Sequence, residues 1–167
     1  FEKRENELLK LLDNHRGKHG EFDCVVPGSG GKDSCYASHM LKYKYGMNPL
    51  TVTWPPILYT NYGYKNFKNW ISSGDFSNIS ARRDEGTMIK LTKLAVMNLM
   101  HPFQTFMLGQ KNYPIQIALK KNIPLVFYGE NEAEHGNPIA DNKSSLRDKS
   151  YFAYKNIDSV YLGGTSI

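Results

Sequence analysis

Hydrophobic positions in the first part of the chain switch from a helical to a strand-like spacing. Residues 2–16 carry four leucines on one side among charged residues and are followed by Gly17, which predicts an amphipathic N-terminal helix. The run at 22–27 is short and apolar, as in a buried strand, and it ends in the glycine-rich stretch 28–31. Residues 33–45 then have helical character. The order is therefore strand, loop, helix.

A second strand is predicted at residues 49–54, which are rich in β-branched side chains and are cut off by Pro55-Pro56. Two successive strand–helix steps imply a parallel sheet flanked by helices, so the fold class is α/β. The aromatic stretch that follows places Tyr64, Phe67 and Trp70 at helical spacing. We interpret this stretch as a helix packing on the sheet, and a stacking platform for bases is the alternative.

The second half of the chain predicts further helices. Residues 72–86 are polar and rich in Gly, Asp and Ser, so we expect a loop without chemistry there. Apolar residues at helical spacing predict one buried helix over 88–99 and another over 115–121.

Residues 125–128 are predicted as a buried third strand, and 159–162 as one more. Together these elements predict one domain over residues 1–167, with the N-terminal helix at 2–16 and a core at 21–167. The chain does not begin with Met and stops at Ile167 soon after two glycines, so we expect a fragment or the ordered part of a longer protein.

Composition narrows the class of protein. With 167 residues, 40% hydrophobic and 22% charged, the chain suits one globular domain and excludes a disordered tail or a fibre. Membrane spans need about 18 uninterrupted apolar residues, and no window approaches that length. The first residues are too charged for a signal peptide, so we expect a cytoplasmic protein. Cys24 and Cys35 cannot form a disulfide framework or a zinc site by themselves.

The net charge of +5 and the pI of about 9.1 would suit phosphate-rich partners. However, the basic pairs Lys42/Lys44, Arg82/Arg83 and Lys120/Lys121 lie in separate segments and are typical of solvated faces. Charge alone therefore does not predict a nucleic-acid partner.

The segment Ser29-Gly30-Gly31-Lys32-Asp33-Ser34 carries the clearest chemical signal. It links the first strand to the first helix, where backbone N–H groups and a helix N-terminus bind phosphate. A Walker A loop is excluded, because it needs Gly where Val26 stands and Ser or Thr where Asp33 stands. The Rossmann fingerprint also fails at Asp33. An ordinary glycine-rich turn is the alternative to a phosphate site.

The Ser-Gly-Gly-x-Asp-Ser pattern resembles the motif of the PP-loop ATP pyrophosphatases, which cleave ATP between its α and β phosphates. This resemblance implies an adenine nucleotide α-hydrolase-like fold that binds ATP and Mg²⁺. The loop amides Gly30 and Gly31, with the hydroxyls of Ser29 and Ser34, would hold the pyrophosphate. Lys32 would add positive charge, and Asp33 would bind Mg²⁺ directly or through water. Thr53 and Trp54, at the end of the second strand, would flank the adenine; a buried Trp beside two prolines is the alternative.

A more specific resemblance is to the N-acetyl sugar amidotransferases of lipopolysaccharide O-antigen and flagellin-glycan (pseudaminic-type) pathways. It rests on residues 25–34, 51–54, 99–104, 109–112 and 127–134. It implies conversion of a sugar acetamido group to an acetamidino group through an adenylated intermediate. Ammonia would come from a separate glutaminase subunit. Members of this family usually begin with a cysteine-rich, zinc-binding segment, which is absent from this sequence.

Further site residues follow the predicted third strand, at the carboxyl edge of the sheet where ligands bind. We expect Gly129 to approach the nucleotide, Glu130 and Glu132 to join Lys32 and Asp33 in catalysis, and Asn131 and Glu134 to bind the sugar. The carboxylates would hold Mg²⁺ or orient the sugar nitrogen and ammonia, and a solvated acidic loop is the alternative. His101 and Gln104 are candidate substrate contacts, with helix capping or packing as their alternative.

Two other functions remain open from the sequence. One is a different PP-loop enzyme, a tRNA-modifying ligase or thiolase, which would need a clustered basic face or sulfur-carrying cysteines. Cys24 is expected in the core, and Cys35 would be a reactive thiol only if the helix N-terminus lowered its pKa. The other is a nucleotide-binding module without catalysis.

Overall fold

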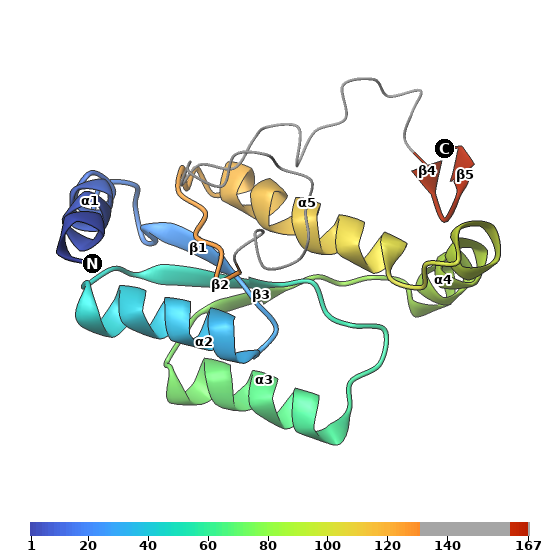
Figure 1. The fold of residues 1–167 in the computed structure, drawn as a ribbon. Coiled ribbons are helices and arrows are strands. Elements are labelled where there is room, and N and C mark those ends of the chain that lie inside the picture. Colours follow the sequence, from blue (N-terminus) through green and yellow to red (C-terminus); the bar gives the residue numbers. More distant parts are fainter. Residues whose placement is uncertain (131–160, 167) are drawn as a thin grey trace. The chain divides into compact units, whose positions relative to one another are not determined.

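A computed structural model describes residues 1–130 and 161–166 of the chain. These residues belong to two units. Unit 1 comprises Phe1–Ala81 and Tyr113–Glu130, and the described part of unit 2 comprises Arg82–Asn112 and residues 161–166. Unit 1 has an α/β fold with a parallel sheet flanked by helices, as the sequence predicts (Figure 1).

The sheet of unit 1 has three parallel strands in the order β1-β2-β3. These are β1 (Cys24–Pro27), β2 (Pro49–Thr53) and β3 (Asn78–Ser80). Val25 is paired with Leu50, and Val52 with Ile79. The two strands predicted at 22–27 and 49–54 are confirmed, and so is their parallel pairing.

Strand β3 corrects the expectation of a loop over 72–86. It is three residues long and has Ile79 as its one apolar side chain, so hydrophobic periodicity does not reveal it. Polar groups hold it instead: the Asn78 amide donates to the Oγ1 atoms of Thr51 and Thr53 at 3.0 and 3.1 Å.

The segment predicted as a third strand, 125–128, lies beside β1 but makes only one parallel bridge, Val25 to Val126. The Val25 N–H donates to the Leu125 carbonyl, and the Phe127 N–H donates to the Val25 carbonyl, both at 2.8 Å. In a parallel sheet both backbone groups of one residue point to the same neighbour, so this segment flanks β1 on the side away from β2. The direction of strand addition therefore reverses at β1.

Helices cover both faces of this sheet. They are α1 (Glu2–Asp13), α2 (Lys32–His39), the π-helical turn η1 (Met40–Lys44), α3 (Asn61–Ser73) and the part of α5 (Gln104–Lys120) from Tyr113 onward, which belongs to unit 1. The helices predicted over 2–16 and 33–45 are confirmed, with somewhat different ends, and the aromatic stretch 57–70 forms the helix α3 from Asn61 onward. The helix predicted over 115–121 corresponds to the last part of α5. The earlier turns of α5 were not predicted, because Gly109 and Pro114 have low helix propensity.

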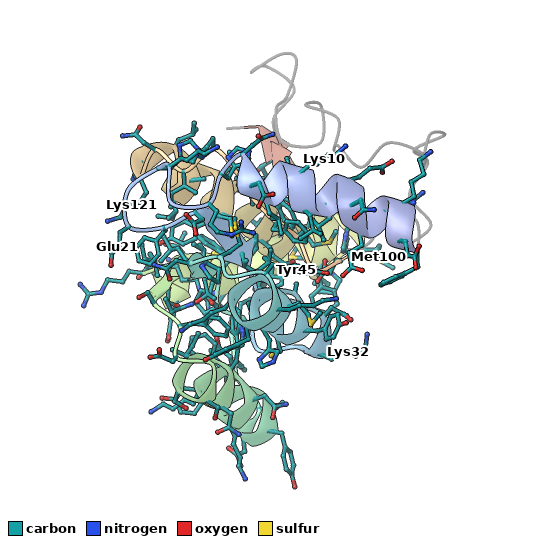
Figure 2. All side chains as sticks on the ribbon, turned by 90° about the vertical axis from the view of Figure 1, so that its left-hand side faces the viewer. Lys10, Glu21, Lys32, Tyr45, Met100 and Lys121 are labelled. Atoms are coloured by element: carbon teal, nitrogen blue, oxygen red, sulfur yellow. The ribbon has the colours of Figure 1, made fainter. Side chains whose placement is uncertain are left out.

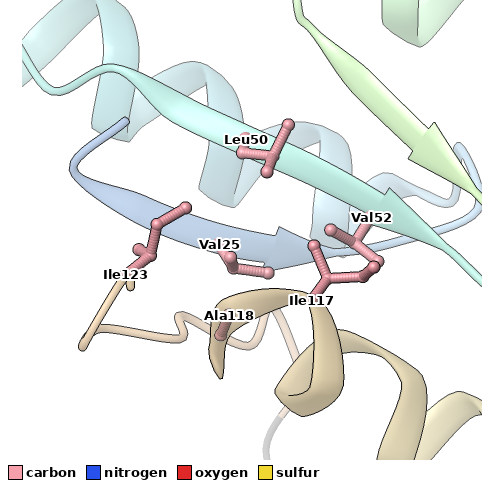
Figure 3. Close-up of a cluster of buried hydrophobic side chains, with 6 residues drawn as sticks. All are labelled: Val25, Leu50, Val52, Ile117, Ala118 and Ile123. Carbon is pink, nitrogen blue, oxygen red and sulfur yellow. The ribbon is translucent and has the colours of Figure 1, made fainter. Parts of the chain in front are cut away.

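Alternation along β1 divides its side chains between the two faces of the sheet. Val25 packs with Leu50 and Val52 against Ile117, Ala118 and Ile123, at and after the end of α5 (Figure 3). On the opposite face, Cys24 and Val26 pack with Leu12, Leu41 and Met47 from α1, η1 and the turn before β2. In Figure 1, α2 and α3 lie on one side of the sheet and the end of α5 on the other.

Unit 2 contains α4 (Glu85–Leu99), the first part of α5, and the antiparallel pair β4 (Tyr161–Leu162) and β5 (Thr165–Ser166). The helix predicted over 88–99 is present as α4, but the expectation that it is buried is wrong: Met88 and Ala95 are buried, whereas the large apolar side chains Ile89, Val96, Met97 and Leu99 are exposed. The helix begins after the Asp84 cap, whose carboxylate accepts the Thr87 N–H at 2.7 Å. The last predicted strand, 159–162, is β4 over its two described residues. Within the described ranges no helix has the length and apolar character to cross a membrane.

Candidate functional site

The link between β1 and α2 is a glycine loop, defined here as residues 28–31. Gly28 continues the sheet for one residue, since its N–H donates to the Val52 carbonyl at 3.0 Å. A Cβ atom on Gly28 would lie 2.6 Å from Cη2 of Trp70. Gly30 has φ +87°, and a Cβ there would lie 2.6 Å from Cα of Phe67. The loop is therefore pressed against α3, and only glycine fits at either position.

Gly31 differs from these two glycines. It is the N-cap of α2, has φ −72°, and its own Cβ position has no heavy atom within 4 Å. It provides no side-chain cap to the helix. The first N–H groups of a helix lack intrahelical partners and carry a positive partial charge. The open side of the glycine loop is therefore suited to an anion that approaches the backbone closely.

A second glycine contact completes the site from the other side of β1. A Cβ on Gly129 would lie 2.8 Å from the carbonyl carbon of Asp33 and 2.9 Å from the backbone nitrogen of Ser34. The chain leaving the 125–128 segment thus touches the first turn of α2, and the exposed Glu130 follows directly. This is the point where strand order reverses, which is where open α/β sheets bind ligands.

The charged and hydroxyl side chains predicted for this site are exposed or half-buried, in the glycine loop and the first turn of α2. Lys32 Nζ is 2.6 Å from Asp33 Oδ1, and the two side chains are 88% and 49% exposed. Lys32 is at the start of α2, extending away from the helix (Figure 2). The Ser34 hydroxyl donates to the Gly31 carbonyl at 3.1 Å, and Ser29 is exposed. The structure thus brings Ser29, Gly30, Gly31, Lys32, Asp33, Ser34, Gly129 and Glu130 together.

Asp33 offers one accessible carboxylate for a cation. Within residues 1–130 and 161–166 no group of three His, Cys, Asp or Glu side chains is arranged to hold a metal ion. Mg²⁺ at nucleotide sites commonly uses one or two carboxylates together with substrate phosphates and water. Asp33, which follows the glycine loop and is paired with Lys32, fits that donor set.

Thr53 is the last residue of β2, and Trp54 follows it directly. The Thr53 side chain is 0% exposed, and its Oγ1 accepts the Asn78 amide, so its hydroxyl is committed to the sheet. The Trp54 ring is 5.6 Å from the Tyr113 ring, centroid to centroid. Burial raises the pKa of the Tyr113 hydroxyl. Of the two predicted adenine contacts, only Trp54 keeps a partly accessible side chain.

The predicted substrate contacts His101 and Gln104 belong to unit 2. Gln104 Oε1 accepts the Gly163 N–H at 3.0 Å and so supports the β4–β5 turn. His101 is exposed and follows Met100, which has left-handed backbone at φ 54°. The remaining predicted residues, Asn131, Glu132 and Glu134, lie outside the described residues.

The structure adds detail to the aromatic stretch that was expected to form a helix: the ring of Tyr59, just before α3, lies 6.0 Å from that of Phe67 and 5.7 Å from that of Tyr64. The helical spacing does not predict that the first turns of α3 stay exposed. The contact of Gly129 with the first turn of α2 was missed in the sequence, where its one signal is a glycine directly after an apolar run. For Cys35, burial raises the thiol pKa, the opposite of an activated cysteine.

Comparison with known proteins adds one relative. Over 52 residues the chain is 42% identical to an uncharacterized protein of Methanocaldococcus jannaschii, a match that covers 31% of this chain and 19% of that protein. The chain therefore matches about a fifth of that relative's length. No family model matches the chain.

Proposed function

We propose that unit 1 binds ATP on the glycine loop as the PP-loop ATP pyrophosphatases do, and that the protein is a cytoplasmic N-acetyl sugar amidotransferase. One observation carries the proposal. The Ser29–Ser34 motif lies where strand order reverses, with Gly30 and Gly129 pressed on backbone and the Gly31 side open. Such a surface binds a polyphosphate through main-chain N–H groups.

In the proposed reaction, the oxygen of the sugar acetamido group attacks the α-phosphorus of ATP and pyrophosphate leaves. Ammonia then adds to the activated carbon and AMP departs, which leaves an acetamidino group. The N–H groups at the start of α2 stabilise the charge that develops on the departing pyrophosphate. Lys32 contributes an exposed ammonium at the same place, paired with Asp33 at 2.6 Å.

Mg²⁺ bound with ATP would neutralise the phosphate charge, and Asp33 is the residue that would hold it. Asp33 is therefore assigned to the nucleotide end of the reaction, and Glu130, one residue beyond the Gly129 contact, to the side where sugar and ammonia meet. Glu132 remains a proposed catalytic residue, and Asn131, Glu134, His101 and Gln104 proposed sugar contacts. A glutaminase subunit is the proposed source of ammonia.

The test is pyrophosphate release from ATP and Mg²⁺ in the presence of ammonium. N-acetyl sugars, free and nucleotide-linked, are compared with bulk tRNA as acceptors. Release of AMP and pyrophosphate that depends on the sugar is the expected result. Release with tRNA alone would assign the protein to the RNA-modifying branch. Nucleotide binding with neither acceptor consumed would indicate a binding module.

Asp33→Asn separates catalysis from binding within the same assay. We expect a much larger loss of kcat than of nucleotide affinity, because the Mg²⁺ that Asp33 would hold neutralises negative charge that grows on the pyrophosphate as it leaves. Asp13→Asn is the matched control, since Asp13 is an exposed aspartate of α1 that pairs with Arg16. Equal losses of rate and affinity in Asp33→Asn would contradict a catalytic role.

A further inference from the structure

The first turns of α3 extend past the glycine loop. The loop meets this helix at Asn66 and Phe67, where the Gly30 contact falls, whereas α3 begins at Asn61. About five residues, or roughly 8 Å of helix at 1.5 Å per residue, therefore continue beyond the contact. Thr60 stabilises this end, because its Oγ1 accepts the Gly63 N–H at 3.0 Å.

A row of aromatic rings leads from the loop to this end of α3. Trp70 lies against Gly28, and its ring is 6.4 Å from that of Phe67. Phe67 is followed in this row by Tyr59 and then by Tyr64, which is 48% exposed. The packing of Tyr59 fixes the Tyr64 ring without covering it. A half-exposed ring that is held in place near the glycine loop provides a stacking surface for the ring of a ligand.

A positive charge accompanies the ring. Lys68 Nζ is 5.1 Å from the centre of the Tyr64 ring, one helical turn along. Lys65 is exposed on the same helix, and α3 contains no Asp or Glu. The glycine loop already has Lys32 and its own N–H groups for the nucleotide. The lysines of α3 are therefore available for a second anionic group.

We propose that Tyr64 and Lys68 form an acceptor-binding surface, and that the acceptor bears a phosphate beside its N-acetyl sugar ring. The sugar ring packs on Tyr64, and the Lys68 ammonium pairs with the phosphate. The identity of the acceptor rests on the proposed function, whereas the preference for an anionic ring compound rests on the charge and exposure of α3. The two residues position the acceptor and take no part in bond breaking.

The test is an NMR titration of the full chain with N-acetylglucosamine 1-phosphate and with N-acetylglucosamine. α,β-Methylene-ATP, which cannot be cleaved between its α and β phosphates, is present so that the glycine loop is occupied. We expect the phosphorylated sugar to bind about tenfold more tightly, as one charge-assisted hydrogen bond would give. Tyr64→Leu and Lys68→Gln should each weaken it by at least about fivefold, and Tyr64→Phe should restore binding.

Tyr62→Leu and Lys10→Gln are the controls. Tyr62 is 82% exposed but lies two positions from Tyr64 and so faces another way, and Lys10 is an exposed lysine of α1. Equal affinity for the two sugars, unchanged binding in the variants, or no saturable binding would overturn the inference. So would perturbation of Tyr64 by a short RNA oligonucleotide but not by the sugar phosphate. Failure of the proposed function would appear separately, as absence of sugar-dependent pyrophosphate release by the unmodified protein.

Discussion

The indole Nε1 of Trp70 donates a hydrogen bond of 2.8 Å to Oγ of Ser38, and both residues are buried. Ser38 in turn donates to the Ser34 carbonyl at 2.7 Å. Because Trp70 also lies against Gly28, this pair ties α3 both to α2 and to the glycine loop. The polar contact therefore fixes the distance between the two helices that frame the site.

Ser38→Ala should destabilise unit 1 by about 1–3 kcal/mol, because it leaves the buried Trp70 N–H without a partner. Urea denaturation followed by tryptophan fluorescence measures this change. Ser72→Ala is the matched control, since the Ser72 hydroxyl bonds to the Lys68 carbonyl on the exposed side of α3. A change no larger than that of the control would show that the Trp70 bond adds nothing to stability.

Gly30→Ala and Gly31→Ala should differ in their effect on the stability of the fold. Gly30 has φ +87° and no room for a Cβ, so alanine there should lower stability by at least about 2 kcal/mol. Gly31 has φ −72° and open space, so alanine there should leave the fold intact.

The Gly31 variant should nevertheless lose affinity for ATP, because its methyl group points to where the phosphates are proposed to bind. Thermal denaturation and ATP titration of both variants check the pair. Unchanged ATP affinity in a folded Gly31→Ala protein would favour an ordinary glycine-rich turn.

The attachment of α1 should depend on pH through Glu5. Hydrogen bonds from Lys44, at 2.5 Å, and from Tyr45, at 3.0 Å, lower the pKa of the Glu5 carboxyl below its ordinary value of 4.5. Tyr45 directly follows η1 and lies between α1 and the continuous helix formed by α2 and η1 (Figure 2). A lowered acid pKa stabilises the fold above the ordinary value, and this stabilisation is lost as pH falls through the folded-state pKa.

Accordingly, the melting temperature should fall as the pH drops below 4.5, and Glu5→Gln should flatten part of that fall. The effect should also shrink in high salt, because the Lys44–Glu5 pair is at the surface. Glu7→Gln, an exposed neighbour on α1, is the control. An identical pH profile for the Glu5 variant and the unmodified protein would rule out this contribution.

The two cysteines should be poor nucleophiles in the folded protein. Burial raises the pKa of Cys24 to about 12, and it also raises that of Cys35. At neutral pH both thiols are therefore protonated. The buried Cys24 should react with a thiol reagent only after unfolding, whereas the partly exposed Cys35 should react slowly in the folded protein. Thiol titration with and without urea measures this. Cys35→Ser should retain any pyrophosphate release, whereas loss of activity would support sulfur transfer.

The α/β class and the β1–loop–α2 unit could be predicted because local signals agree there. The run ending at Pro27, the glycines and the helical pattern each point to the same element. By contrast, β3 depends on the hydrogen bonds that Asn78 makes to β2, which no local pattern contains. The early turns of α5 were missed since Gly109 and Pro114 are poor helix formers, and packing overrides that preference.

The site could be predicted only as far as the motif extends. The residues from Ser29 to Ser34 are contiguous, so their shared location follows from the chain itself. The fit of Gly129 on Asp33, and that of Gly30 on Phe67, depend on how distant segments pack. Thr53 shows the converse: its position at the end of β2 suggested a ligand contact, but its side chain is buried and its hydroxyl accepts a hydrogen bond from the Asn78 amide of β3.

Pairing of Val25 with Val126 also has a consequence for how the protein is made. The two residues are about 100 positions apart, and the chain passes through all of Arg82–Asn112 between them. Contacts so far apart in sequence are slow to form, because a long loop must close first. During synthesis, β1 must wait with one edge unpaired until residue 126 has emerged from the ribosome. The contact of Gly129 with the first turn of α2 can form only after that, so a nascent chain stalled before this point should lack nucleotide binding even with β1, α2 and β2 in place.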